Sequence, residues 1–259
     1  MTSVDQHINL DALAARLDSA AFTATAIPQL EQSISLEQAY AIQKLSIGRR
    51  LQRGERGIGI KMGFTSRAKM QQMGVSDMIW GRLTSAMLVE DGGSIRLRDY
   101  VHPRVEPEVA FLISRPLSGR VTAPQALAAV EAVAPALEII DSRYENFRFS
   151  LTDVVADNSS SSSFVVGPWS SPQTDLDNLG LVMAFDGSAQ AFGSSAAILG
   201  HPLRSLVAAA RVVAEAGESL QPGDIVLAGG ATAACALRAG IHVSLEMQSL
   251  GRCGFHVEA

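Results

Sequence analysis

The residues Val105-Glu106-Pro107-Glu108-Val109-Ala110-Phe111 are typical of a β-strand that carries two carboxylates. Side chains alternate faces along a strand, so Glu106 and Glu108 point the same way, about 7 Å apart. Two negative charges on one side of an otherwise apolar strand repel each other and lose hydration unless a cation lies between them. A bound divalent metal ion is one explanation. The other is an edge strand with a solvated acidic face, which Pro107 would also suit.

Glu138 is a third carboxylate in apolar surroundings, because it lies between Leu137 and Ile139. A central strand is a poor place for an isolated charge. A salt bridge from Glu138 to Arg104 or Arg143 would be a purely structural explanation. A joint metal site of Glu106, Glu108 and Glu138 is the alternative. The sequence has no Cys-x-x-Cys and no closely spaced histidine pair, so oxygen ligands favour Mg²⁺ or Mn²⁺.

Lys61 lies in the apolar run Ile58-Gly59-Ile60-Lys61-Met62-Gly63-Phe64, which predicts a strand. Burying a lysine is costly, and a desolvated lysine is useful as a proton donor or as a local positive charge. We therefore take Lys61 as a candidate catalytic residue. The alternative is that its side chain extends to the surface.

Two further stretches have the composition of ligand-binding loops. Asp157-Asn158-Ser159-Ser160 offers hydroxyls and amides that could bind carboxylate oxygens, although a surface turn has the same composition. Gly229-Gly230-Ala231-Thr232 follows an apolar run and allows the backbone to approach a ligand closely. It lacks the lysine of a P-loop and the spacing of a dinucleotide fingerprint, which argues against nucleotide binding. No Gly-x-Ser-x-Gly motif is present, which argues against a serine hydrolase.

The composition favours a soluble protein with a large core. The 259 residues are 47% apolar, and the net charge of −5 offers no basic surface for nucleic acid. The two cysteines, Cys235 and Cys253, do not suggest a disulfide framework. We find no secretory signal and no apolar segment near the ~18 residues of a membrane span. We expect a cytoplasmic protein that does not bind membranes.

Periodicity divides the chain into a helical region, residues 1–56, packed on a core of residues 57–259. Apolar spacing from Ile8 to Leu17 and the capping box Ser35-Leu36-Glu37-Gln38 predict helices in the first region. In the second region a capping box at Thr122 predicts a helix that buries Leu127, Val130 and Val133 and ends at Pro135. We also expect helices over 66–73 and 202–217, and strands over 58–64, 101–114, 137–140, 224–228, 241–247 and 254–257.

Four motifs together resemble one known family. They are KMGFTSRAKM (61–70), MGVSDMIWGRL (73–83), VHPRVEPEVAF (101–111) and QPGDIVLAGG (221–230). They are similar to the hydratase/decarboxylase branch of the fumarylacetoacetate-hydrolase-like superfamily, and the likeness covers residues 35–258. The resemblance implies an α/β (α+β) fold, a mixed β-sheet roll of the fumarylacetoacetase C-terminal-domain type with a helical N-terminal region.

The resemblance also implies a site. Glu106, Glu108 and Glu138 match the family's metal carboxylates, and Lys61 matches its active-site lysine. Asp157, Ser160 and Thr232 fall where related proteins line the substrate cavity. Ile79 stands where the branch's hydratases carry an acidic residue. With Trp80 it suggests an apolar pocket, although Asp77 nearby could still supply a carboxylate.

The activity implied is Mg²⁺- or Mn²⁺-dependent decarboxylation of 2-oxo-3-hexenedioate, a 2-oxo dicarboxylate from the meta-cleavage of aromatic compounds. No organic cofactor is expected, because the carbonyl of the 2-oxo substrate can itself accept electrons. The alternative activity is hydration of 2-hydroxypenta-2,4-dienoate, or another metal-dependent reaction of 2-oxo acids such as acylpyruvate hydrolysis. A non-catalytic scaffold for the hydratase is the alternative from another class of protein. The resemblance further implies a complex with that hydratase, and we expect a homo-oligomer.

Overall fold

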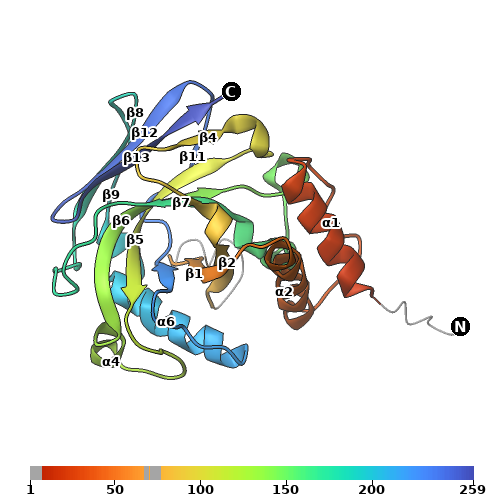
Figure 1. The fold of residues 1–259 in the computed structure, drawn as a ribbon, viewed down its shortest axis with the longest axis horizontal. Helices are drawn as coiled ribbons and strands as arrows, with labels where there is room; N and C mark the ends of the chain where they lie inside the picture. Colours follow the sequence, from red (N-terminus) through yellow and green to blue (C-terminus); the bar gives the residue numbers. More distant parts are fainter. Residues whose placement is uncertain (1–7, 67–69, 71–76) are drawn as a thin grey trace, which may run out of the picture.

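Two β-sheets form the centre of the molecule in the computed structural model, which describes residues 8–66, 70 and 77–259. The larger sheet has the strand order β2-β1-β10-β5-β6-β7-β3, with β11 paired to β5. The smaller sheet has the order β4-β13-β12-β8-β9. Helices α1 and α2 lie side by side at one end of the molecule (Figure 1). Both sheets contain parallel and antiparallel pairs, so the expected mixed β-roll is confirmed.

The larger sheet is built around its two longest strands, β5 (Arg104–Ile113) and β6 (Val130–Ile140), which pair antiparallel. The remaining strands are short: β1 (Gly57–Gly63), β2 (Ile79–Thr84), β3 (Leu88–Val89), β7 (Ser161–Val166), β10 (Ile225–Leu227) and β11 (Cys235–Ala236). Because β5 has neighbours on both sides, it is a central strand. The edge-strand explanation of the paired glutamates is therefore wrong.

Pro107 is accommodated in this central strand because the chain opposite it bulges. The carbonyl of Pro107 accepts a hydrogen bond from Ala231 N–H, on the side of β5 that faces the segment between β10 and β11. In an antiparallel strand the N–H and C=O of one residue point to the same side. The N–H that proline lacks would therefore point toward the irregular turn at Gly229-Gly230, where the ladder is already interrupted.

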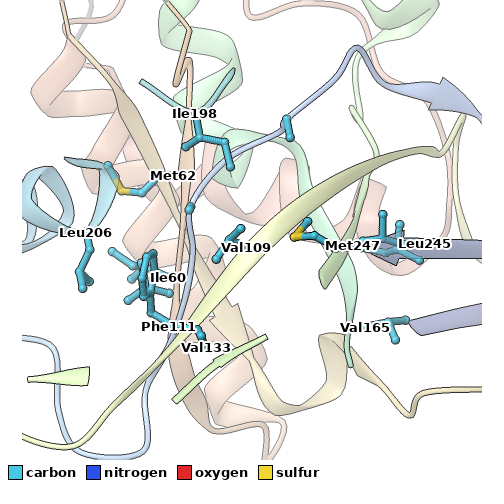
Figure 2. Close-up of a cluster of buried hydrophobic side chains, with 14 of the residues drawn as sticks. Ile60, Met62, Val109, Phe111, Val133, Val165, Ile198, Leu206, Leu245 and Met247 are labelled. Atoms are coloured by element: carbon cyan, nitrogen blue, oxygen red, sulfur yellow. The ribbon is translucent and has the colours of Figure 1, made fainter. Parts of the chain in front are cut away.

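The smaller sheet contains β4 (Ser94–Arg96), β8 (Gly180–Phe185), β9 (Ser188–Ser194), β12 (Ile241–Met247) and β13 (Gly251–Glu258). Strand β12 buries Ile241, Val243, Leu245 and Met247, as its alternating sequence predicts. Figure 2 shows side chains of β1, β5, β6 and α6 gathered in one core, among them Ile60, Phe111, Val133 and Leu206. The opposite face of β5 remains available for charged residues.

The long helices follow their sequence signals. Helix α1 (Leu10–Phe22) buries Leu13 and Leu17, and α2 (Leu36–Gln52) begins with the complete capping box of Ser35. Helix α5 (Leu151–Ala156) packs against α2. Helix α6 (Pro202–Glu215) starts at the proline and stops before Gly217, whose φ is +73°. Short 3-10 turns link several strands: η1 (Ser85–Met87), η2 (Leu97–Asp99), η3 (Glu145–Phe147), η4 (Asn158–Ser160) and η5 (Ser195–Ala197).

Length and composition alone make the segment Ser195–Glu215 a candidate membrane span. Half of its most apolar window is buried inside the fold. Leu206, Ala209 and Ala210 of α6 are fully buried in the core. Packing in the core therefore accounts for the apolar composition of this segment.

One expected helix is wrong. The capping box at Thr122 forms, but the helix it opens, α4 (Ala123–Leu127), ends before Val130. Val130 and Val133 lie on β6 and pair with Ile113 and Phe111 of β5, and Pro135 lies inside the strand. Pairing in the central sheet outweighs the local helical pattern of this stretch. The helix expected over residues 66–73 lies largely outside the described residues, and the division at residue 56 stays a prediction.

Candidate metal centre

The carboxylates of Glu106, Glu108 and Glu138 form one buried cluster. Each offers an oxygen atom, and these oxygens lie within 4.8 Å of one another. Glu106 and Glu108 are on the same face of β5, and Glu138 on β6 is the direct cross-strand partner of Glu106. Ala136 lies opposite Glu108, and its small side chain leaves room for the carboxylate.

Lys61 supplies a positive charge to this cluster. Its Nζ lies 3.1 Å from Glu138 Oε2, and its side chain is only 6% exposed, so it does not extend to the surface. Ile60 and Met62 pack into the apolar core on the other face of β1, which directs Lys61 toward the carboxylates. The expected structural partners of Glu138 are wrong: Arg143 pairs with Asp157, and Arg104 packs on Phe147.

Burial and mutual repulsion shift the ionisation of the cluster. Burial, together with the charge of Glu138, raises the pKa of Glu108 well above its ordinary value, and burial also raises the pKa of Glu138. Burial opposes the charge of Lys61, but Glu138, Glu108 and Glu106 together outweigh it and raise the pKa of the ammonium. Lys61 is therefore protonated at neutral pH, and it acts as a cation or an acid instead of a base.

The cluster meets the requirements of a divalent cation. Three carboxylates lie together here, and Lys61 pairs with one of them, Glu138. Within the described part of the chain, Glu108 Oε1 and Glu138 Oε1 are buried without a hydrogen-bond partner. Buried oxygens of this kind need a donor or a cation. A set of oxygen donors with no thiolate or imidazole suits Mg²⁺ or Mn²⁺.

The glycine turn after β10 packs against these carboxylates. Gly229 N–H donates a hydrogen bond to Glu108 Oε2 at 2.7 Å. A Cβ on Gly229 would lie 2.1 Å from Thr65 Oγ1, and a Cβ on Gly230 would lie 2.6 Å from Glu106 Oε2. The sequence suggested that these glycines allow the backbone to approach a ligand, and the structure shows that they approach the carboxylates.

A cavity of about 470 Å³ lies beside the cluster. Lys61 and Glu106 line one part of it, and Ile79 and Ser160 also contribute to its wall. The remaining lining residues come mostly from loops: Met62, Gly63, Phe64, Thr65, Arg104, Ile140, Phe147, Phe149, Val154, Ser159, Gly230, Ala233 and Ala234. The cavity therefore has charged groups at the metal centre and many apolar side chains elsewhere.

The polar loop after α5 has an unusual backbone. Asn158, Ser159 and Ser160 have φ values of +50°, +52° and +59°, a left-handed region that non-glycine residues rarely occupy. The side chain of Asn158 holds the loop by exchanging two hydrogen bonds with the backbone of Arg82. Ser160 Oγ is buried at the cavity wall and has no hydrogen-bond partner in the described structure. A strained loop at the wall of a cavity is a candidate for a functional role.

The other three expected substrate residues do not line this cavity. Asp157 forms a buried ion pair with Arg143, and burial raises its pKa to about 6 although Arg143 opposes the shift. The ring of Trp80 stacks on Tyr40 at 5.6 Å, and its carbonyl accepts a hydrogen bond from Ser159 Oγ. Thr232 Oγ1 donates a hydrogen bond to the carbonyl of Ala233.

Sequence reasoning missed Arg104, Phe147 and Phe149 as cavity residues. Arg104 was considered only as a partner for Glu138, although it shares a strand face with Glu106 and could have been found from that alternation. Phe147 and Phe149 lie in an irregular segment between β6 and α5, and their rings are 5.6 Å apart. No periodic pattern marks such a segment.

Comparison with known proteins identifies the fold family. Residues 57–258 match the family described as fumarylacetoacetate (FAA) hydrolase C-terminal. The chain belongs to this family. The match covers all the strands and the residues of the carboxylate cluster, so the likeness extends to the candidate metal centre.

Relatives of known activity span nearly the whole chain. A 4-oxalocrotonate decarboxylase of Pseudomonas sp. is 60% identical over 250 residues, 96% of this chain and 98% of that protein. A solved 4-oxalocrotonate decarboxylase from Pseudomonas putida G7, complexed with magnesium and adipate, is 37% identical with a TM-score of 0.93. This match covers 96% of this chain and 97% of the solved one. A 2-keto-4-pentenoate hydratase of Paraburkholderia xenovorans (strain LB400) is 36% identical, covering 84% of this chain and 82% of the hydratase.

Proposed function

We propose that this protein is a divalent-metal-dependent decarboxylase of 2-oxo-3-hexenedioate, also called 4-oxalocrotonate. The products would be 2-hydroxypenta-2,4-dienoate and CO₂, in the meta-cleavage degradation of aromatic compounds. The observation that carries the proposal is the buried cluster of three carboxylates and one lysine beside a cavity. The 60% identical decarboxylase supports the choice of reaction within the family.

Glu106, Glu108 and Glu138 would hold the metal ion, Mg²⁺ or Mn²⁺. The relative solved with magnesium and adipate supports this, since adipate is a dicarboxylate with the same number of carbons as the proposed substrate. When bound, the ion supplies Lewis-acid chemistry that favours electron flow toward the 2-oxo group of the substrate. The Gly229 N–H fixes one oxygen of Glu108, so the ligand set is oriented before the ion binds.

Lys61 would stabilise the enolate that forms as CO₂ leaves. The C5–C6 bond breaks, and its electron pair forms the C4–C5 double bond while the C3–C4 π electrons move to C2–C3. The C2 carbonyl then becomes an enolate oxygen. The Lys61 ammonium, which lies beside the carboxylates and lines the cavity, could donate a proton to that oxygen. Protonation completes 2-hydroxypenta-2,4-dienoate.

Apolar side chains of the cavity would keep water from the reacting carbons. Ile79 is 4% exposed and lines the cavity together with Phe64, Phe149 and Val154. Fewer waters around the substrate favour the loss of charge from its departing carboxylate. Ser160 also lines the cavity.

Hydration of 2-hydroxypenta-2,4-dienoate is the second candidate, because a hydratase is among the relatives. Ile79 provides no proton-transfer group at the position where the hydratases are expected to carry an acid. Asp77, the other possible acid, pairs with Arg211 at 2.7 Å, is half exposed and does not line the cavity. Both observations favour the decarboxylase.

The direct experiment compares the two reactions with one preparation of protein. Purified protein with Mg²⁺ is incubated with 2-oxo-3-hexenedioate, and CO₂ release is measured. The same protein is incubated with 2-hydroxypenta-2,4-dienoate, and loss of the diene absorbance is measured. We expect CO₂ release that a chelator abolishes and Mg²⁺ restores. Diene loss without CO₂ release would favour the hydratase, and inactivity in both assays would favour a non-catalytic scaffold.

We further propose that the protein forms a homo-oligomer and associates with the hydratase that consumes its product. The reactive dienol would then pass between the two enzymes over a short distance. Size-exclusion chromatography with light scattering, of the protein alone and mixed with a purified hydratase, tests both associations. Elution of the two proteins as independent species would exclude a stable complex.

A further inference from the structure

Arg104 presents a guanidinium group to the cavity without an anionic partner. Within the described part of the chain its side chain forms no ion pair and no hydrogen bond, and its guanidinium lies over the ring of Phe147. Lys61, a second cation at the cavity wall, is already paired with Glu138. A partly buried guanidinium that faces a cavity with no carboxylate partner is suited to binding an anionic ligand.

The surroundings of Arg104 hold the group in place. Its guanidinium carbon lies 4.3 Å from the ring centroid of Phe147. Phe147 has a φ of +56°, a strained value for an aromatic residue, and its ring also contacts His102 and Phe149. Stacking uses the face of the guanidinium and leaves the N–H groups at its edge available to a carboxylate in the same plane.

Arg104 lies at a defined distance from the metal centre. Arg104 and Glu106 are on the same face of β5, two residues apart, about 7 Å along the strand. Across the sheet, Arg104 pairs with Ile140 of β6, which in turn pairs with Ser161 of β7. The unpartnered hydroxyl of Ser160 is therefore at the same level of the sheet as Arg104, one step beyond the carboxylate cluster.

We propose that Arg104 binds the distal carboxylate of the substrate and makes the protein selective for 2-oxo dicarboxylates over 2-oxo monocarboxylates. This inference rests on the proposed function, in which the 2-oxo end of the substrate lies at the carboxylate cluster. A six-carbon chain has the length to extend from that cluster to a group two strand residues away.

The role of Arg104 is recognition, because its attraction does not increase during the reaction. The distal carboxylate loses its charge as it becomes CO₂, so the ion pair with Arg104 is strongest before the bond breaks. An interaction that is not stronger in the transition state lowers KM without raising kcat. Removing Arg104 should therefore raise KM for the dicarboxylate at least about 10-fold. This factor corresponds to the weakest stabilisation expected of a hydrogen bond to a charged group. We expect kcat to stay the same or rise, because the lost ion pair stabilises the bound substrate at least as much as the transition state.

A matched pair of ligands tests this proposal without relying on turnover. Binding of 2-oxoadipate and of 2-oxohexanoate, which has a methyl group in place of the distal carboxylate, is measured by calorimetry with Mg²⁺. The wild-type protein should bind 2-oxoadipate at least about 10-fold more tightly, and Arg104→Met should remove this preference while leaving 2-oxohexanoate binding unchanged. Arg104→Lys, which keeps the charge without the planar fork, should retain part of the preference.

The control variant is Arg53→Met. Arg53 also lies over a phenylalanine ring, Phe22, at 5.6 Å, but it is on the surface of the helix pair and away from the cavity. It should keep the full preference for 2-oxoadipate. A preference that survives in Arg104→Met, or an equal loss of affinity for both ligands, overturns the role of Arg104. Failure of the wild-type protein to bind either ligand in a Mg²⁺-dependent manner instead overturns the proposed function.

Discussion

Glu106 and Glu138 are directly opposite each other on the antiparallel strands β5 and β6, and both are buried. Like charges in a cross-strand pair destabilise a sheet, and burial adds the cost of lost hydration. Lys61 offsets the charge of Glu138 through a contact of 3.1 Å. The fold therefore holds an arrangement that costs stability by itself, and a bound divalent cation would relieve it.

Glu106→Gln should separate the metal role of the cluster from a structural role. The amide keeps the size of the side chain but removes one charge and one good metal ligand. We expect Mg²⁺ affinity and activity to fall together by at least about 10-fold. Changes to residues that only contact the metal ligands already cost about that much, so the loss of a ligand should cost no less. The thermal midpoint of the metal-free protein should stay the same or rise, because fewer charges repel. A lower metal-free midpoint with unchanged Mg²⁺ affinity would indicate a structural glutamate.

The carboxylate cluster could be predicted from the sequence because the patterns that indicate it are local. Alternation along one strand is enough to place Glu106 and Glu108 on the same side, and an apolar context is enough to single out Glu138. The partner of Glu138 could not be read in the same way. Lys61 reaches it from β1, which joins the sheet through β10, a strand more than 150 residues later in the chain.

The errors arose where tertiary pairing decided the outcome. The capping box at Thr122 is real, but the residues after Leu127 gain more from the centre of the sheet than from a helix. Pro135 then lies inside a strand instead of ending a helix. Phe147, which shapes the cavity, has a left-handed backbone that no propensity of phenylalanine would suggest.

Stabilisation by Mg²⁺ should increase as the pH rises. Burial raises the pKa values of Glu108 and Glu138, so the folded metal-free protein binds these protons more tightly than the unfolded chain does. Their contribution to stability is therefore present below the ordinary glutamate value of 4.5 and is lost as the pH rises through the raised values. Metal ions compete with those protons. The shift in thermal midpoint on adding Mg²⁺, measured from mildly acidic to mildly alkaline pH, should grow; a shift independent of pH would contradict this.

Gly230→Ala should damage the metal centre without removing a ligand. The added Cβ would lie 2.6 Å from Glu106 Oε2, so the carboxylate must move away from the cluster. We expect weaker Mg²⁺ binding, measured by calorimetry, in a protein that remains folded. Gly48→Ala is the matched control, because that glycine is in α2 with no atom within 4 Å of its added Cβ. It should keep full Mg²⁺ affinity and gain about 0.5–1 kcal/mol of stability. Equal Mg²⁺ affinities in the two variants would show that Mg²⁺ binding does not depend on the present position of the Glu106 carboxylate.

Lys61→Met should have the opposite effect on metal binding from the glutamate variant. Methionine fills a similar volume but removes the ammonium 3.1 Å from Glu138 Oε2. The cluster becomes more negative, so Mg²⁺ affinity should rise or stay constant, while the metal-free protein becomes less stable. The proton donor is also lost, and kcat should fall about 100-fold or more, the scale of general acid catalysis. Steady-state kinetics at saturating Mg²⁺ and calorimetry on the same preparation measure both quantities. An unchanged kcat at saturating Mg²⁺ would show that Lys61 has no part in the chemistry beyond its effect on the ion.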